Sequence, residues 1–249
     1  MSNLAQTVGR RVLSVGAVIA LWFIASRIVG TNLFPGPPEV IGDLTMLITT
    51  GRFFTPLTAT LGRTILGFLS ALFFGLLYGI LAARVPWFRR AMAPPVTLLL
   101  FLPTLGVVLI GLVVIGTGTT RAAVFITTVG VFTTIGVYVR DAMLDLDKNV
   151  IELANSYKVP QRRRIVDIYI PYLTPVLLGA GRIAFNLTWK IMLLAEVFGF
   201  SGGLGYQVRL AFGSYNMTRL LAWMTVFVVA LLLIEQLVRL VEKRVVRWA

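Results

Sequence analysis

Lys190 and Glu196 are the two side chains of this sequence that come nearest to a catalytic pair, an amine beside a carboxylate. They stand six residues apart within an apolar run, so a helix would place them on different faces. The sequence has no histidine, the commonest general base and metal ligand, and no cysteine for a disulfide framework. This inventory argues against a metal site and excludes a Ser-His-Asp hydrolase, so we expect no enzyme active site.

The composition indicates that these residues are positioned by membrane helices. Hydrophobic residues make up 57% of the 249 residues and charged residues only 13%, whereas a soluble domain is about 25% charged. A membrane-spanning helix needs about 20 apolar residues. We therefore predict a single all-α membrane domain, residues 1–249, with about six spans. The net charge of +13 lies mostly in short loops, where it sets topology, so we expect no nucleic-acid partner.

Six apolar runs are the expected spans, at about 12–29, 54–83, 91–116, 122–139, 168–198 and 218–240. The first run could instead be a cleaved signal peptide, but no small-x-small site follows it and several spans come after it. Pro103 is expected to kink the third run. Gly75 and Gly79, four residues apart, fit close helix packing, although ordinary glycine usage in membranes would also explain them.

The distribution of basic residues predicts the orientation of the chain. Fourteen Lys and Arg lie in the first, third, fifth and last polar segments, against three in the segments between them, Arg52, Arg121 and Arg209. Both termini and segment 140–167 are therefore expected in the cytoplasm, and the glycine-rich segment 199–217 outside.

A short amphipathic helix is expected at about 149–158, within the longest polar segment. Val150, Leu153, Ala154 and Tyr157 fall at i, i+3, i+4 and i+7 and form one apolar stripe. Asn149 and Glu152 have the spacing of a capping box, and Pro160 ends the helix. Such a helix needs a partner, which is either a lipid surface or another protein.

Glu152-Leu153-Ala154, followed by Ile168-Tyr169-Ile170-Pro171, resembles the EAA loop of ABC importer permeases. The resemblance implies a cytoplasmic coupling helix, between spans four and five, that docks into a groove of the ATPase subunit. The coupling residues would be Val150, Glu152, Leu153, Ala154, Tyr157 and Lys158. Leu153 stands where the motif has alanine. Lys158 stands where it has glycine, which predicts a differently shaped helix end. The Arg162-Arg163-Arg164 run is expected to meet anionic lipid, or otherwise the ATPase.

A second stretch, Thr188 to Val208, resembles the permeases that serve sulfonates, taurine, nitrate and thiamine-precursor pyrimidines. Trp189, Ala195-Glu196 and the outer segment Gly203-Leu204-Gly205-Tyr206 carry this likeness. The third run departs from the pattern, with Leu109 and Val114-Ile115 before Gly116. If these positions line the path, the substrate would be different or more apolar.

Five residues are candidates for the translocation path or its gate: Arg63, Pro103, Thr127, Lys190 and Glu196. Lys190 either faces the path and attracts an anion or pairs with a carboxylate such as Glu235. Arg63 either faces a partner or extends its charge to the outer interface. Thr127 either lines the path or bonds back to its own helix. Glu196 is expected to cap backbone N–H groups of the outer segment.

The resemblance also implies partners. They are a cytoplasmic ABC ATPase dimer, a second permease copy, an external substrate-binding protein and the lipid of the bacterial inner membrane. The sequence has no G-x-x-x-x-G-K-S/T loop, so we expect ATP and Mg²⁺ on the ATPase and no cofactor on this chain. The alternative function is an ion-coupled secondary transporter, for which Glu196 and Glu235 are the deep acidic candidates.

Overall fold

The computed structural model describes the backbone of residues 2–245 and the side chains of residues 13–240. Within residues 2–245 the chain is helical, with no β-strand. The last basic residues of the sequence, within 242–249, have their side chains outside the described residues. The elements in chain order are α1 (Ser2–Val29), α2 (Pro37–Thr49), α3 (Phe54–Arg84), α4 (Pro86–Phe101), α5 (Thr104–Ile115), α6 (Thr120–Asp145), α7 (Lys148–Ser156), α8 (Gln161–Arg164), the π-helix η1 (Ile165–Tyr169), α9 (Ile170–Gly199), α10 (Leu204–Gly213) and α11 (Met217–Val245).

Four segments of the described chain are long and apolar enough to cross a membrane. They are α3, α6, the continuous segment Gln161–Gly199 and the part of α11 up to Leu240. The predicted third span, 91–116, is not one kinked helix: α4 and α5 meet at 104°. Leu102 and Pro103 between them are extended, with ψ near 130°. The ring of Pro103 disfavours the helical conformation at Leu102, the residue directly before it. The apolar part of α1, Leu13–Val29, is shorter than the four spans.

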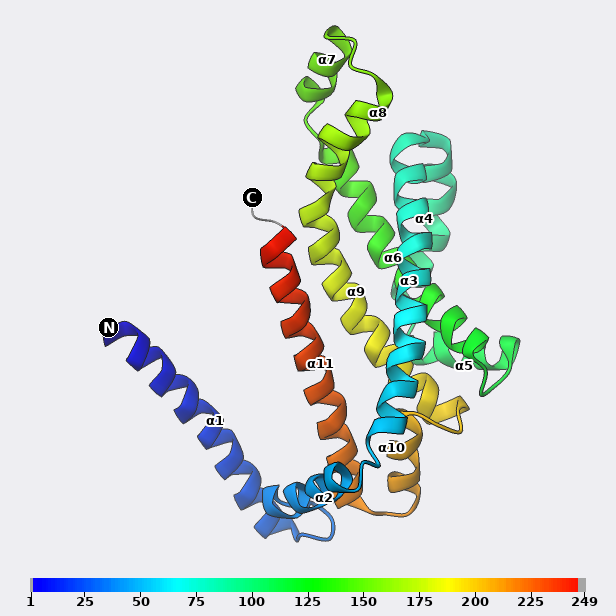
Figure 1. The fold of residues 1–249 in the computed structure, drawn as a ribbon. Coiled ribbons are helices and arrows are strands. Elements are labelled where there is room, and N and C mark those ends of the chain that lie inside the picture. Colours follow the sequence, from blue (N-terminus) through cyan, green and yellow to red (C-terminus); the bar gives the residue numbers. More distant parts are fainter. Residues whose placement is uncertain (1, 246–249) are drawn as a thin grey trace.

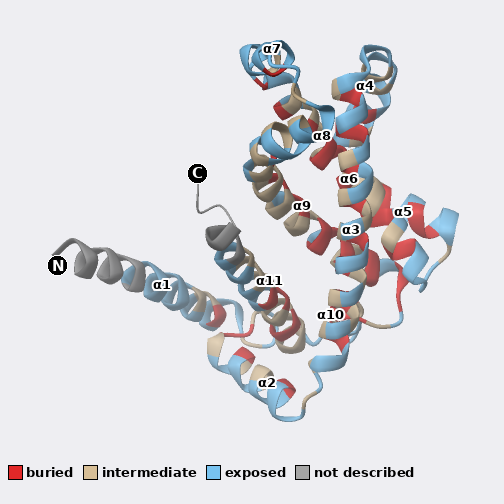
Figure 2. Cartoon of the chain, turned by 45° about the horizontal axis from the view of Figure 1, so that its top comes forward, coloured by how far each residue is buried: buried red, intermediate tan, exposed pale blue. Residues whose placement is uncertain are grey.

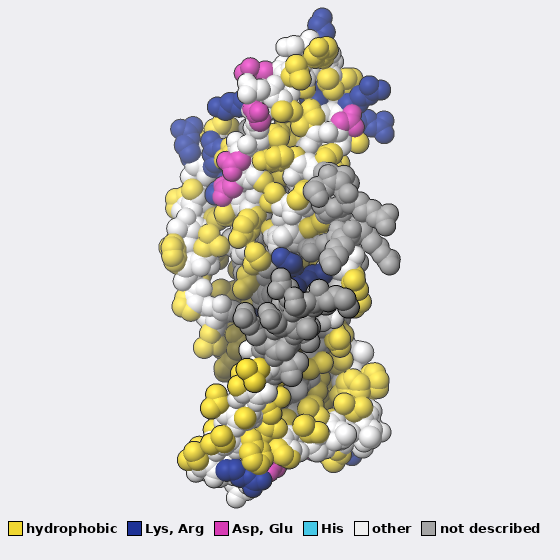
Figure 3. All heavy atoms as spheres, turned by 90° about the vertical axis from the view of Figure 1, so that its left-hand side faces the viewer, with side chains coloured by type: hydrophobic (Ala, Val, Ile, Leu, Met, Phe, Trp, Pro, Cys, Tyr) yellow, Lys and Arg dark blue, Asp and Glu magenta, His cyan; other side chains and the backbone are white. Residues whose placement is uncertain are grey.

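The helices are arranged between two ends of an elongated molecule (Figure 1). One end carries α7, α8 and the junction of α3 with α4, and the opposite end carries α2, α10 and the starts of α3 and α11. Lys and Arg side chains gather at the α7 end (Figure 3). This is the end that the charge pattern assigns to the cytoplasm, and we refer to the α2 and α10 end as the outer end.

Helices α3 and α6 form the most extensive contact of the fold. Their backbones approach closely at two glycines of α3. A Cβ added to Gly75 would lie 2.7 Å from Cβ of Ile135, and one added to Gly79 would lie 2.7 Å from the carbonyl oxygen of Gly136. The close packing predicted for this glycine pair is therefore confirmed, because no larger residue fits at either position.

A second core joins α2, α9, α10 and α11 at the outer end. The Trp189 ring stacks on Phe227 at 5.1 Å between centroids, and its Nε1 donates to the Phe227 carbonyl at 3.3 Å. Leu47 and Leu204 are fully buried beside them. By contrast, α1 leans away from the bundle, and its described surface is mostly exposed (Figure 2). Its apolar residues, such as Ile28 at 79% exposed, need lipid or another chain to cover them.

Candidate functional site

Helix α7 begins at Lys148 and is capped by Asp147. The Asp147 Oδ1 accepts a hydrogen bond from the Asn149 backbone N–H at 2.8 Å, and Asp147 itself is extended. The predicted capping box of Asn149 with Glu152 is therefore wrong. The acidic residue two positions earlier takes the capping role, because its carboxylate reaches the first free N–H groups of the helix.

The C-terminus of α7 has the geometry that a glycine usually supplies. Lys158 has φ +50°, the Lys158 N–H donates to the Asn155 carbonyl at 2.9 Å, and the Val159 N–H donates to the Ala154 carbonyl at 2.9 Å. These two bonds define a Schellman motif with Lys158 in the left-handed position. The prediction that replacing glycine changes the shape of this helix end is therefore wrong: the shape is kept, at the cost of backbone strain.

The exposed surface of α7 is partly apolar. Val150, Leu153 and Tyr157 are 39%, 60% and 77% exposed, whereas Ala154 is buried. The predicted four-residue stripe therefore divides, with three members on the surface and Ala154 inside. Glu152 is also exposed. A large, free apolar surface on a two-turn helix that projects from the end of the molecule is suited to insertion into another protein.

Arg164 ties the end of α7 to the start of the following span. Its Nε donates to the Val159 carbonyl at 2.7 Å, its Nη2 approaches the Ala154 carbonyl at 3.5 Å, and its Nη1 donates to the Asn155 side chain. Arg164 is therefore held by bonds within the chain, whereas Arg162 and Arg163 are exposed. The sequence alone gives no signal that separates Arg164 from its two basic neighbours.

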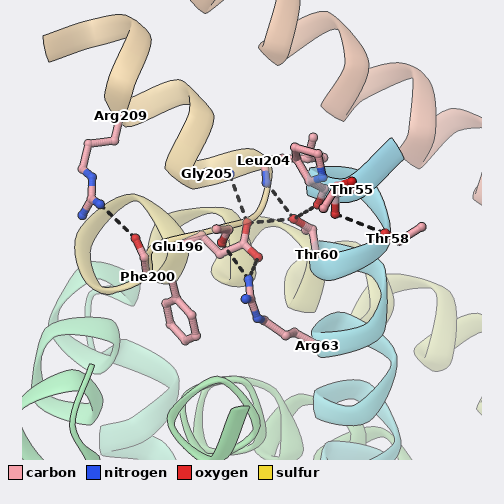
Figure 4. A network of polar contacts seen from close by, with 11 residues as sticks. Thr55, Thr58, Thr60, Arg63, Glu196, Phe200, Leu204, Gly205 and Arg209 are labelled. Atoms are coloured by element: carbon pink, nitrogen blue, oxygen red, sulfur yellow. Dashed lines mark hydrogen bonds and ion pairs between the residues drawn. The ribbon is translucent and has the colours of Figure 1, made fainter. Parts of the chain in front are cut away.

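A buried polar network, shown in Figure 4, holds the glycine-rich segment at the outer end. Its centre is Glu196, which is fully buried. The Arg63 Nη1 lies 2.6 Å from Glu196 Oε1. Glu196 Oε2 accepts from Thr60 Oγ1 at 2.8 Å and from the Gly205 N–H at 3.0 Å. The predicted capping role of Glu196 is thus confirmed, at the N-terminus of α10.

The same network ties the outer segment to α3. The Thr60 Oγ1 accepts from the Leu204 N–H at 2.8 Å, and Arg63 Nη1 donates to the Gly202 carbonyl at 2.8 Å. The Arg63 guanidinium also lies over the Phe200 ring, 4.8 Å from its centroid. Arg63 therefore faces a partner and does not extend to the interface. Thr60 was not predicted as a site residue. It stands three residues before Arg63, so the two side chains are neighbours on one helix face, and this spacing could have identified it.

Two glycines of the outer segment are required because other atoms of the protein lie too close to leave room for a side chain. Gly203 has φ +109°, and a Cβ there would overlap the Glu196 carboxylate; a Cβ at Gly205 would overlap the Leu193 carbonyl. The sequence did not predict that a helix, α10, follows directly. Arg209 of α10 donates to the Phe200 carbonyl at 2.9 Å, which closes the segment back onto the end of α9.

The remaining path candidates lie in different environments. Thr127 is buried, and its Oγ1 donates to the Ala123 carbonyl at 2.7 Å. Thr127 therefore bonds back to its own helix, the second of its two predicted roles. Pro103 is exposed at the bend between α4 and α5. Lys190 is exposed on α9, and Glu235 pairs with Arg239 at 2.9 Å and not with Lys190. Of the predicted path residues, only Lys190 presents a charge at the surface of the described bundle.

Comparisons with known proteins give the family. The family of binding-protein-dependent transport system inner membrane components matches residues 75–247. Similar proteins include SsuC of Bacillus subtilis, named for aliphatic sulfonates transport, at 24% identity over 93% of this chain and 84% of that protein. The nitrate import permease protein NrtB of Synechococcus elongatus is 27% identical over 76% of this chain and 71% of its own length. The taurine transport system permease protein TauC of Escherichia coli is 24% identical over 95% and 89%.

The fold is also similar to a solved structure. A chain of the MetNI methionine ABC transporter, in an inward-facing conformation, superposes with a TM-score of 0.62 and 21% identity over 76% of this chain and 91% of that chain. At this identity the likeness shows the fold. The apolar spans, the fold and the match over residues 75–247 agree. The chain belongs to the family of binding-protein-dependent transport system inner membrane components, and it is a multi-pass ABC importer permease of the inner membrane.

Proposed function

We propose that the chain is the transmembrane subunit of an ATP-driven importer and that α7 is its coupling helix. The observation that carries this proposal is the exposed apolar surface of α7, with Leu153 and Tyr157 at 60% and 77% exposed, at the basic end of the molecule. Val150, Leu153 and Tyr157 enter a groove of a cytoplasmic ABC ATPase, with Glu152 as a charged anchor beside them. Ala154 and Lys158 set the position and the end of the helix.

The rest of the assembly follows from having one coupling helix per chain. Two copies of the permease present two coupling helices to an ATPase dimer, which binds ATP and Mg²⁺. The apolar surface of α1 is exposed, which supports the presence of a further chain or of lipid beside this helix. A substrate-binding protein delivers its cargo at the outer end. There, Arg63 and Glu196 hold the segment Gly203, Leu204, Gly205 and Tyr206 as part of the outer gate, with Thr127 supporting α6 behind it.

The substrate is a small organic or inorganic anion, of the sulfonate, taurine or nitrate kind, or a pyrimidine-type thiamine precursor. Support comes from the names of the relatives and, for an anion, from the exposed ammonium of Lys190. Pro103, at the bend between α4 and α5, also borders the path. The rival ion-coupled transporter is weakened by Glu196, because both of its oxygens are already bonded within the protein.

The test is recovery of the ATPase with the tagged permease in mild detergent, identified by mass spectrometry. Leu153→Asp puts a charge on the docking surface. The matched control is Leu210→Asp, an exposed leucine at 48% on α10 at the opposite end. We expect the ATPase with wild type and with the control, and at least tenfold less with Leu153→Asp. Equal recovery with all three would overturn the role of α7, and no ATPase with any would overturn the importer.

A further inference from the structure

A groove lies between α3 and α6, and we call it the α3–α6 groove. Its volume is about 430 Å³, within the range of about 300 to 1,000 Å³ that is usual for small-ligand sites. The four lining residues from Arg121 to Thr128 fall at i, i+3, i+4 and i+7, so they share one face of α6. This face begins with a cation and continues as an apolar surface. The full lining is Ser70 and Phe74 of α3 and Thr120, Arg121, Val124, Phe125 and Thr128 of α6.

The α3–α6 groove begins on the outer side and runs into the membrane. The Gly118 N–H, in the turn before α6, donates to the carbonyl of Gly199 at 2.7 Å, and Gly199 is the outer end of α9. The start of α6 is therefore on the side that the charge pattern predicts for Arg121. Thr128 lies seven residues further on, about 10 Å along the axis, which is well inside a hydrocarbon core of about 30 Å. There the Thr128 Oγ1 donates to the Ser70 Oγ at 2.9 Å, so the hydroxyls bond to each other and the surface suits hydrocarbon.

The Arg121 side chain has no partner among the described residues. It is exposed, and its guanidinium makes no hydrogen bond or ion pair within residues 13–240. By contrast, Arg63 is paired with Glu196 at 2.6 Å. Arg219, also toward the outer end, lies 2.7 Å from the Asp43 carboxylate. A guanidinium at the edge of the membrane, with no carboxylate from its own chain, requires a counter-charge from another molecule.

A second copy of the chain is poorly suited to supply that counter-charge. The acidic residues of the outer side are Glu39, Asp43 and Glu196. Two of them are already held in the ion pairs just described, and the Oε2 of Glu39 is buried within its own chain. The phosphate of an anionic phospholipid offers a negative charge at this level of the membrane, and a guanidinium can bind a phosphate through two parallel hydrogen bonds. The positive end of the α6 dipole adds to this attraction.

We propose that the α3–α6 groove binds one anionic phospholipid in the outer half of the membrane. The lipid phosphate pairs with Arg121 at the start of α6, and one acyl chain lies against Phe74, Val124 and Phe125. The two phenylalanines are 48% and 40% exposed, so their rings are available to the chain. This lipid site goes beyond the transport role proposed above, because it depends on neither the ATPase nor the cargo.

The test is native mass spectrometry of the full chain, purified in mild detergent with the subunits that accompany it, at increasing concentrations of phosphatidylglycerol. Wild type should hold one such lipid more tightly than it holds phosphatidylcholine with the same acyl chains, because only phosphatidylglycerol carries a net negative charge. Arg121→Gln should weaken this binding about tenfold and remove the preference. Arg52→Gln, at an exposed outer-side arginine that does not line the groove, is the matched control and should bind as wild type does.

A second variant, Val124→Trp, fills the groove and leaves Arg121 in place, and it should also lose the lipid. Its control is Val113→Trp, at a valine of α5 that is 84% exposed. Wild-type lipid binding by both Arg121→Gln and Val124→Trp would overturn the proposal. Binding of glycerol 3-phosphate as tight as that of phosphatidylglycerol would overturn it as well, because the site would then take a soluble phosphate. Loss of dimers in the same two variants, with lipid binding unchanged, would overturn it by assigning the groove to a contact between two copies.

Discussion

The Arg63 guanidinium lies 2.6 Å from the Glu196 carboxylate and joins two helices at positions 133 residues apart. The pair also organises the chain around it, because Glu196 accepts from the Gly205 N–H and Arg63 donates to the Gly202 carbonyl. One ion pair thereby fixes α3, α9 and the start of α10 relative to one another. The following expectations for the outer end depend on this relationship.

Glu196→Leu should destabilise the protein more than the loss of one contact would suggest. It leaves the Arg63 charge with no carboxylate in a mostly buried site, and breaking such a pair costs about 3 kcal/mol or more. The double variant Arg63→Leu with Glu196→Leu should lose less than the sum of the two single changes. The measurement is unfolding of the purified protein in detergent. Strict additivity would mean that the two residues act independently.

Gly203→Ala should be far more harmful than Gly202→Ala, although the two glycines are adjacent. Gly203 has φ +109° and faces the Glu196 carboxylate, whereas a Cβ at Gly202 meets no atom within 4 Å. We expect Gly203→Ala to cost roughly 3 kcal/mol, from backbone strain and overpacking together. Gly202→Ala should unfold close to wild type in the same detergent assay. A similar loss for both would argue that the segment simply needs flexibility.

The sequence predicted the features that depend on repeated, local patterns. The apolar runs predicted the helical membrane class, and the spacing of Gly75 and Gly79 fitted close helix packing, for which the structure supplies the partner, α6. Glu196 was identified as a cap because an acidic residue directly before a glycine-rich segment meets free N–H groups there. Each of these inferences needed only a single stretch of chain and a general physical rule.

The features that the sequence did not predict depend on contacts between distant stretches or on choices among equal neighbours. The pairing of Thr60 with Leu204 spans 144 positions. Arg164 is chemically the same as Arg162 and Arg163, and only the fold decides which one reaches the end of α7. Pro103 was predicted to kink a helix, but α4 and α5 meet at 104°, and each of them packs against α6, a later stretch of the chain.

Lys158→Gly should stabilise the C-terminus of α7. The lysine occupies a left-handed conformation, φ +50°, which costs about 1 kcal/mol for a residue with a Cβ and almost nothing for glycine. Amide hydrogen exchange at Lys158 and Val159 measures this directly, and we expect slowing of several fold. Lys158→Ala is the control, since it removes the charge but keeps the Cβ. Slowing by both variants would assign the effect to charge and not to conformation.

Arg164→Gln should loosen the connection between α7 and α9. The guanidinium holds the Val159 carbonyl at 2.7 Å and the Asn155 side chain at the end of α7, and a hydrogen bond from a charged group contributes about 1.5 to 3 kcal/mol. We expect faster amide exchange across residues 154–160 and several-fold less ATPase recovered with the tagged protein.

Arg163→Gln is the matched control for this change. It removes the same charge from an exposed neighbour, so it should leave exchange and ATPase recovery near wild type. If the two variants behaved alike, the basic run would act as a single electrostatic patch toward lipid or the ATPase, and the hydrogen bonds of Arg164 would have no separate role. If only Arg164→Gln has an effect, the position of α7 depends on this one side chain, which ties the end of α7 to the start of the following span.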